Sequence, residues 1–155
     1  MRELTKKYKA KLFINDRLDI ALAVKADGIH LTQNSIPADA VKKAVRAVRF
    51  TLNTQHQIPP HPPLTKGGWG DFYALRFLIG VSTHSLKEAR EAEKAGADFI
   101  TLGPVYRTAS KLKYGKPLGV DTLKAVSKKV KIPVFAICGI KSHRIKHIKN
   151  AGAYG

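Results

Sequence analysis

The chain has 155 residues, a length that suits one domain with a buried core, and 44% of them are apolar. It carries 28 Lys and Arg against 11 Asp and Glu, a net charge of +17, which favours an anionic partner such as nucleic acid, acidic lipid or a phosphorylated metabolite. A single cysteine, Cys138, excludes an internal disulfide framework and predicts a cytoplasmic protein. We expect neither a membrane span nor a signal peptide.

Short apolar segments predict buried strands, and amphipathic segments between them predict helices. The strands are expected at 11–15, 28–31, 76–82, 98–103 and 133–138, and the helices at 35–48, 85–98 and 120–130. Ser35 is the expected cap of the first of these helices, Ser85 and Glu88 have the spacing of a capping box, and Gly96 is a natural stop. Repeated helix–strand units of this kind predict a parallel α/β sheet, either open or closed into a barrel.

One segment, residues 51–73, has no such periodicity and is rich in Pro, Gly and polar residues. A structureless connection of this length in a compact domain is either functional or an insertion. Its two histidines, His56 and His61, have no carboxylate or cysteine near them in sequence to complete a metal site. We therefore interpret 51–73 as a disordered insertion in a single domain that spans 1–155.

Polar residues follow four of the predicted strands, at the point where each strand ends. They are Asn15 and Asp16, then Ser82 and His84, then Thr108, Ser110 and Lys111, and finally Gly139. The carboxyl ends of parallel strands meet at one edge of a sheet, where sites in α/β proteins form. A carboxylate suits a hard cation, hydroxyls and a lysine suit phosphate oxygens, and a glycine permits close approach of the backbone. The pattern predicts a phosphate-handling site.

Each of these residues also has a purely structural interpretation. Asp16 could cap a helix that starts at Arg17, His84 could pack beneath its loop, and Lys111 could be solvated beside its neighbouring lysines. The other cations lie mostly on predicted helices, without the interleaved aromatic residues that stack on nucleic-acid bases. Convergence of four connections on one edge favours the phosphate site, and we expect no specific nucleic-acid partner and no membrane partner.

Three segments resemble the thiamine phosphate synthase family, which includes the thiazole tautomerases: "FINDRLDIALAVKADGIHLTQ", "IGVSTHSLKEAREAEKAGADFITLGPVY" and "PLGVDTLKAVSKKVKIPVFAICGI". The resemblance covers nearly the whole chain outside the insertion. It implies a (β/α)8 TIM barrel and a transferase of thiamine biosynthesis. This reaction joins hydroxymethylpyrimidine diphosphate to a thiazole phosphate and releases diphosphate with the help of Mg2+.

The resemblance also implies a role for each residue of the site. Asn15 would contact the diphosphate of the pyrimidine substrate, and Asp16 would ligate Mg2+. Ser82 and Lys111 would hold the leaving diphosphate, with His84 as a further catalytic candidate. The thiazole phosphate would be bound by Thr108, Ser110 and the backbone of Gly139.

The chain also departs from the family pattern. Ser35 stands where the family has an acidic second Mg2+ ligand, which weakens the expected metal site, and Cys138 stands where a glycine is common. The first two strands, the family's Gln-x-Arg-x-x-Lys motif and the last strand have no counterpart in the sequence. We therefore expect an incomplete (β/α)8 TIM barrel of about five βα units, with open sheet edges through which the protein could self-associate.

Three functions follow from these observations. The first is a thiamine phosphate synthase-like protein, truncated and weak or inactive by itself. The second is a thiazole tautomerase-like isomerase, with His84 as its base. The third is a non-catalytic remnant that binds anions nonspecifically through its charge.

Overall fold

The described residues form a five-stranded parallel sheet with the strands in sequence order, β1-β2-β3-β4-β5. The computed structural model describes residues 1–55, 77–109, 111 and 115–155. The strands are β1 (Phe13–Asn15), β2 (Gly28–Leu31), β3 (Leu78–Thr83), β4 (Phe99–Leu102) and β5 (Val134–Ala136). Consecutive parallel strands joined by helices are the repeating unit of a (β/α)8 barrel, and here the sheet is open, as we expected.

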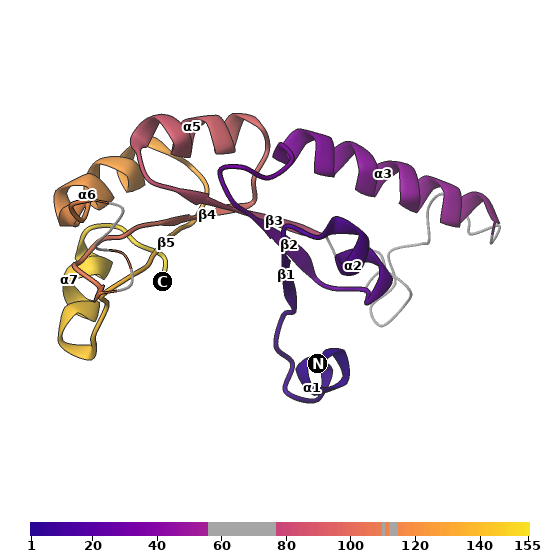
Figure 1. Cartoon of the computed structure of the whole chain (residues 1–155), viewed down its shortest axis with the longest axis horizontal. Helices are drawn as coiled ribbons and strands as arrows, with labels where there is room; N and C mark the ends of the chain where they lie inside the picture. Colours follow the sequence, from indigo (N-terminus) through magenta and orange to yellow (C-terminus); the bar gives the residue numbers. More distant parts are fainter. Residues whose placement is uncertain (56–76, 110, 112–114) are drawn as a thin grey trace, which may run out of the picture.

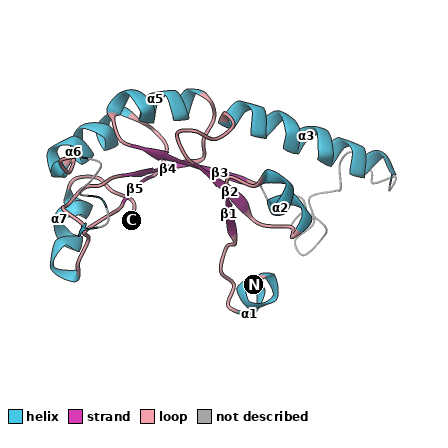
Figure 2. Ribbon diagram, in the orientation of Figure 1, coloured by secondary structure: helices cyan, strands magenta, loops and turns pink. Residues whose placement is uncertain are grey.

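In chain order the helices are α1 (Arg2–Lys7), α2 (Leu18–Ala23), α3 (Ala38–Gln55), α5 (Leu86–Lys94), α6 (Gly119–Lys129), the 3-10 turn η2 (Ser142–Arg144) and α7 (Ile145–Asn150). Helices α3, α5 and α6 run along the outer side of the curved sheet, whereas α1 lies apart, beyond the start of β1 (Figures 1 and 2). Among the described residues, no helix has the length and apolarity that a membrane span requires.

Alternation along the strands decides which side chains form the core. Ile29 and Ile79 are paired across β2 and β3 and pack with Val41 of α3. Ile100 of β4 packs with Leu123 of α6, and both are fully buried. Because successive residues of a strand point to opposite faces, the core residues alternate with residues that lie on the concave face.

The concave face carries a continuous row of aromatic side chains, which we call the aromatic stripe. Ring centroids lie 5.4 Å apart for Phe13 and Phe99, 5.4 Å for Phe99 and Phe135, and 5.3 Å for Phe135 and Tyr154. Gly80 makes this row possible, because a side chain there would collide with the Phe99 ring on the adjacent strand. The row therefore crosses the sheet from β1 to beyond β5.

The sheet continues past β5 for two residues. Tyr154 N–H donates to the Val134 carbonyl at 2.8 Å, and Ala136 N–H donates to the Gly155 carbonyl at 2.8 Å. These bonds flank β5 as a neighbouring parallel strand would.

Two expected boundaries are corrected by the structure. Residues 51–55, which we assigned to the disordered insertion, form the end of α3, since no Pro or Gly interrupts the helix before Pro59. Residues 56–73 lie outside the described residues. Ser35 does not cap α3: the helix begins at Ala38, and the Ser35 hydroxyl bonds elsewhere.

The Ser85 cap of α5 is confirmed, while Glu88 reaches the residue before the cap instead of the Ser85 N–H that a full capping box would use. Ser85 Oγ accepts a hydrogen bond from Glu88 N–H at 3.2 Å, while the Glu88 carboxylate accepts one from His84 N–H at 2.8 Å. Gly96 follows the helix with a φ of +87°, as its position after the last turn predicted.

Candidate substrate-binding edge

The residues predicted for the site lie at the carboxyl ends of the strands, which we call the carboxyl edge. Asp16 follows β1, Ser82 is the penultimate residue of β3, Lys111 lies on the connection after β4, and Gly139 lies on the connection after β5. The parallel strand order brings these connections to one side of the sheet. Ser110 lies outside the described residues.

Asp16 and Ser35 are in direct contact. The Ser35 hydroxyl donates to Asp16 Oδ1, which also accepts a hydrogen bond from Thr32 N–H at 3.2 Å. Thr32 N–H and the Thr32 hydroxyl lie 2.7 and 2.9 Å from Ser35 Oγ. The carboxylate is therefore held by the connection after β2.

This contact settles the structural alternative for Asp16. The residue that caps α2 is Arg17, and no side chain makes a capping hydrogen bond there. Asp16 instead adopts a φ of +58°, in the left-handed region that Asp tolerates better than most residues. Its carboxylate faces the β2–α3 connection at the exposed carboxyl edge.

A groove of about 280 Å³ lies beside this cluster. It is bounded by the β2–α3 connection and by α5, and Thr32, Ser35, Ser82 and Glu88 are among its lining residues. On the concave face, the Thr101 hydroxyl lies 3.4 Å from Ser82 Oγ. Ser82 therefore both lines the groove and contacts Thr101 on β4.

His84 is fixed at the end of β3 by its ring. Nδ1 lies 2.5 Å from the carbonyl oxygen of Gly103, so Nδ1 carries the hydrogen and Nε2 is left as the acceptor nitrogen. The side chain is exposed. This geometry allows His84 to accept a proton at Nε2.

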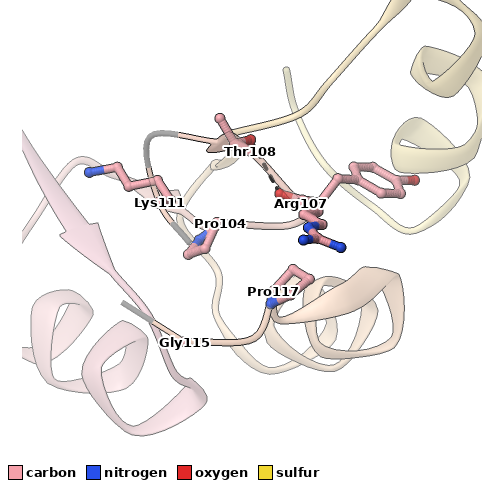
Figure 3. A pocket seen from close by; sticks show the side chains of 7 residues that line it. Pro104, Arg107, Thr108, Lys111, Gly115 and Pro117 are labelled. Atoms are coloured by element: carbon pink, nitrogen blue, oxygen red, sulfur yellow. Dashed lines mark hydrogen bonds between the residues drawn. The ribbon is translucent and has the colours of Figure 1, made fainter. Parts of the chain in front are cut away.

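A second, separate and much smaller pocket, of about 10 Å³, lies under the connection after β4 (Figure 3). Thr108 and Lys111 line it together with Pro104, Tyr106, Arg107, Gly115 and Pro117. The Thr108 hydroxyl donates to the Tyr106 carbonyl at 3.4 Å, and Lys111 and Arg107 extend to opposite sides of Pro104. The predicted residues thus fall into two hollows along one edge.

Gly139 is packed against the wall of this pocket. A Cβ atom at this position would lie 2.7 Å from Tyr106 Cβ and 3.0 Å from the Arg107 carbonyl oxygen, and its φ is +68°. The preceding Cys138 has a φ of +71°, a conformation that favours glycine, which explains why a glycine suits that position. The β5 connection can reach the β4 connection only because Gly139 has no side chain.

Three of the residues at this edge were missed by the sequence-based reasoning. Thr32 directly follows β2, and the rule that selected Asp16 and Ser82 would also have found it. Tyr106 and Arg144 stack on each other, but in the sequence Arg144 is one of several cations in "KSHRIKHIKN". No spacing signal separates it from its solvated neighbours.

The pKa of His30 depends on its burial and on the charge of Asp16 at the carboxyl edge. Burial lowers the pKa of His30, which faces the concave side on β2, while the nearby negative charge of Asp16 opposes that shift. His30 Nε2 lies 3.2 Å from the Thr101 hydroxyl. A neutral imidazole is therefore the favoured form beneath the carboxyl edge.

The fold defines a class: a parallel α/β protein of the barrel type, with polar residues gathered at the carboxyl ends of its strands. The family model described as thiamine monophosphate synthase matches residues 1–57 and 71–155. The chain therefore belongs to the thiamine monophosphate synthase family. The match leaves out residues 58–70, within the segment interpreted as an insertion.

Individual relatives agree with the family. The chain is 44% identical to the putative thiamine-phosphate synthase 2 of Aquifex aeolicus over its whole length, which is 67% of that protein. It is 42% identical to the putative thiamine-phosphate synthase of Geobacter sulfurreducens, of which it spans 60%. The structure of the thiamine phosphate pyrophosphorylase from Pyrococcus furiosus matches with a TM-score of 0.70 and 32% identity, over 98% of this chain and 58% of that one. The chain thus spans 58 to 67% of the length of these relatives.

Proposed function

We propose that this chain carries the phosphate-binding edge of a thiamine phosphate synthase. Its substrates would be hydroxymethylpyrimidine diphosphate and a thiazole phosphate. The observation that carries the proposal is the gathering of Asp16, Ser82, Thr108 and Lys111 at the carboxyl edge of a sheet with this family's sequence. The named relatives are synthases, which favours the transferase over a tautomerase or a nonspecific anion binder.

The donor diphosphate is assigned to the Asp16 side of the edge. In the reaction, the bond between the pyrimidine methylene carbon and the diphosphate oxygen breaks, and its electron pair leaves on the diphosphate. A ring nitrogen of the thiazole then forms the new bond to that carbon. Negative charge therefore grows on the diphosphate, where the hydroxyl of Ser82 would stabilise it. Lys111 lines the pocket after β4 but extends away from Arg107, and its ammonium is proposed to reach the diphosphate between the two hollows.

The residues near Asp16 fit a weakly held Mg2+. They offer one carboxylate and the hydroxyls of Thr32 and Ser35, which are oxygen ligands of the kind Mg2+ prefers. Among the described residues, no group of three His, Cys, Asp or Glu side chains could hold a metal ion. We therefore assign the metal to Asp16 with the substrate's own phosphate oxygens, and when bound it would neutralise charge on the leaving diphosphate.

The acceptor phosphate is assigned to the surface around the small pocket of Figure 3, which is too small to enclose a phosphate. Thr108 would offer its hydroxyl, and the backbone of Gly139 lies against Tyr106 and Arg107 in the wall of that pocket. Ser110 keeps the same assignment from sequence alone. His84, with Nε2 as acceptor, is proposed to take or return a proton at the boundary between the two phosphates.

We expect the 155-residue polypeptide by itself to bind these substrates without detectable turnover. The sheet of the described residues is open, and these five strands do not supply the contacts that the further strands of a closed barrel would make to the substrates. The loss of even one preorganised contact commonly costs about a hundredfold in rate. We also propose that the protein is located in the cytoplasm. We further propose that it self-associates through the open edges of its sheet.

The test compares three purified proteins: the wild-type chain, Lys111→Ala, and Lys128→Ala as a control. Lys128 is an exposed cation in the last turn of α6, away from the carboxyl edge. Calorimetric titration should show Mg2+-dependent binding of hydroxymethylpyrimidine diphosphate that weakens tenfold or more in Lys111→Ala and less than about twofold in Lys128→Ala. Equal binding by the two variants would contradict the assignment, and rapid formation of thiamine phosphate would contradict the expected inactivity.

A further inference from the structure

Arg144, the last residue of η2, joins two connections of the carboxyl edge. Its Nη1 donates a hydrogen bond of 2.7 Å to the carbonyl oxygen of Gly139, on the connection after β5. Its guanidinium carbon lies 4.3 Å from the ring centroid of Tyr106, on the connection after β4. One half-buried side chain therefore touches both connections.

Tyr106 is held from a second direction by the same segment. Its hydroxyl lies 3.5 Å from Nδ1 of His147, one turn further along in α7. Gly139 packs directly behind it, since a Cβ there would lie 2.7 Å from Tyr106 Cβ. Tyr106 is thus enclosed by residues of the β5–α7 segment, while it lines the pocket of Figure 3.

The contacts of Arg144 do not neutralise it. A carbonyl oxygen and an aromatic ring are both neutral partners, and both orient a guanidinium without cancelling its charge. A guanidinium has five N–H groups, of which this hydrogen bond uses one. The side chain thus brings an oriented positive charge against Tyr106, which lines the pocket.

We infer that Arg144 is a positioning residue for the acceptor phosphate. Its contacts hold Tyr106 against Gly139, so that the wall of the pocket of Figure 3 and the backbone of Gly139 keep a fixed position relative to each other. Its guanidinium also adds positive charge beside these two residues. This inference rests on the proposed function, because that function assigns the phosphate to the surface around this pocket. It concerns a residue that neither the motifs nor the strand-end rule selected.

The test uses Arg144→Ala and Arg144→Lys, with Lys146→Ala as the matched control. Lys146 is an exposed cation in α7 two residues away, so its removal changes the net charge equally. Binding of the thiazole phosphate and of inorganic phosphate is measured by calorimetry. We expect Arg144→Ala to weaken both about tenfold, from the loss of a charged hydrogen bond and a cation–π contact. Arg144→Lys should recover only part of this, since lysine lacks the planar fork, and Lys146→Ala should stay within about twofold.

Two readouts separate positioning from simple charge. Cys138 is the only cysteine and adjoins Gly139, so its rate of modification by a thiol reagent should rise in Arg144→Ala and not in Lys146→Ala. Millimolar guanidinium ion should restore phosphate binding to Arg144→Ala more than an equal concentration of sodium ion does. Circular dichroism reports whether Arg144→Ala is folded, and if it is not, Arg144→Lys alone is compared with the wild type.

The outcomes distinguish this inference from the proposed function. If Arg144→Ala binds phosphate with the same affinity as Lys146→Ala, the inference is wrong. If Arg144→Ala does not fold, the same comparison is made with Arg144→Lys. A wild-type chain that binds Mg2+-diphosphate but no acceptor phosphate would also overturn it, while leaving the donor assignment intact. If the wild type binds neither ligand, the proposed function itself fails.

Discussion

Replacing Ser35 with Asp should convert a weak magnesium site into a stronger one. In the wild type, the Ser35 hydroxyl donates to the Asp16 carboxylate, so the two side chains already touch. An aspartate side chain places its carboxyl carbon where the serine oxygen lies. The two carboxylates would then lie about 4 Å apart or closer, where repulsion between unit charges costs about 1 kcal/mol in water and about 4 kcal/mol at an effective dielectric constant near 20.

The solvent exposure of residues 16 and 35 favours the lower part of this range of repulsion energies. Asp16 is exposed and Ser35 is half-buried, so solvent screens the pair. We expect Ser35→Asp to lower the free energy of unfolding by about 1–2 kcal/mol in the absence of a divalent ion. Mg2+ should reverse this loss, because a second carboxylate raises the charge of the ligand set, and we expect about tenfold tighter binding.

Thermal unfolding with and without Mg2+ is the assay. At saturating Mg2+, a tenfold gain in affinity adds about 1.4 kcal/mol, which shifts the unfolding midpoint of a domain of this size by about 3–6 °C. Ser35→Asn is the matched control, since it has the same shape without the charge. If Mg2+ stabilises Ser35→Asn or the wild type as much as Ser35→Asp, then Asp16 and residue 35 do not share a metal site.

Two further predictions concern stability. Burial lowers the pKa of His30, so the folded state takes up its proton at a lower pH than the unfolded state. The neutral form therefore contributes stability that is present above the unfolded value and is lost as pH falls below about 6.5. Urea titrations between pH 7.5 and 5.5 should show a shallower loss for His30→Gln, and an unchanged slope would contradict this cause. Separately, Gly139→Ala should cost more than Gly119→Ala in the free energy of unfolding, by about 1–3 kcal/mol. Both have positive φ, at +68° and +79°, but only Gly139 has atoms within contact range of a new Cβ. Equal losses in chemical denaturation would show that crowding against Tyr106 is unimportant.

Local sequence signals predicted the strands and one helix well. The segment 28–31 is β2 to the residue, and the Ser85–Glu88 spacing forms the cap it predicted. These features depend on neighbours in sequence, which periodicity and capping rules describe. Parallel order and the shared carboxyl edge followed from the same units, because helical crossovers permit few other arrangements.

Contacts between distant segments were harder to predict. Ser35 has the local sequence of a helix cap, but the cluster with Thr32 and Asp16 holds its hydroxyl instead. Which of the cations beyond residue 140 meets Tyr106 depends on the path of the chain after β5, which a run of lysines, arginines and histidines does not encode in its spacing. Arg144 becomes distinctive only once Gly139 and Tyr106 are placed beside it.

The proposed function requires that phosphorylated substrates bind at the carboxyl edge of the sheet. Amide chemical shifts of the isotope-labelled chain, followed by NMR during titration with hydroxymethylpyrimidine diphosphate and Mg2+, test it directly. We predict shifts concentrated at residues 15–16, 32–35, 82–84 and 108–111, with little change at 26–28 and 97–99, where strands begin. Shifts concentrated at the strand beginnings, or spread evenly over the exposed lysines, would contradict substrate binding at the carboxyl edge.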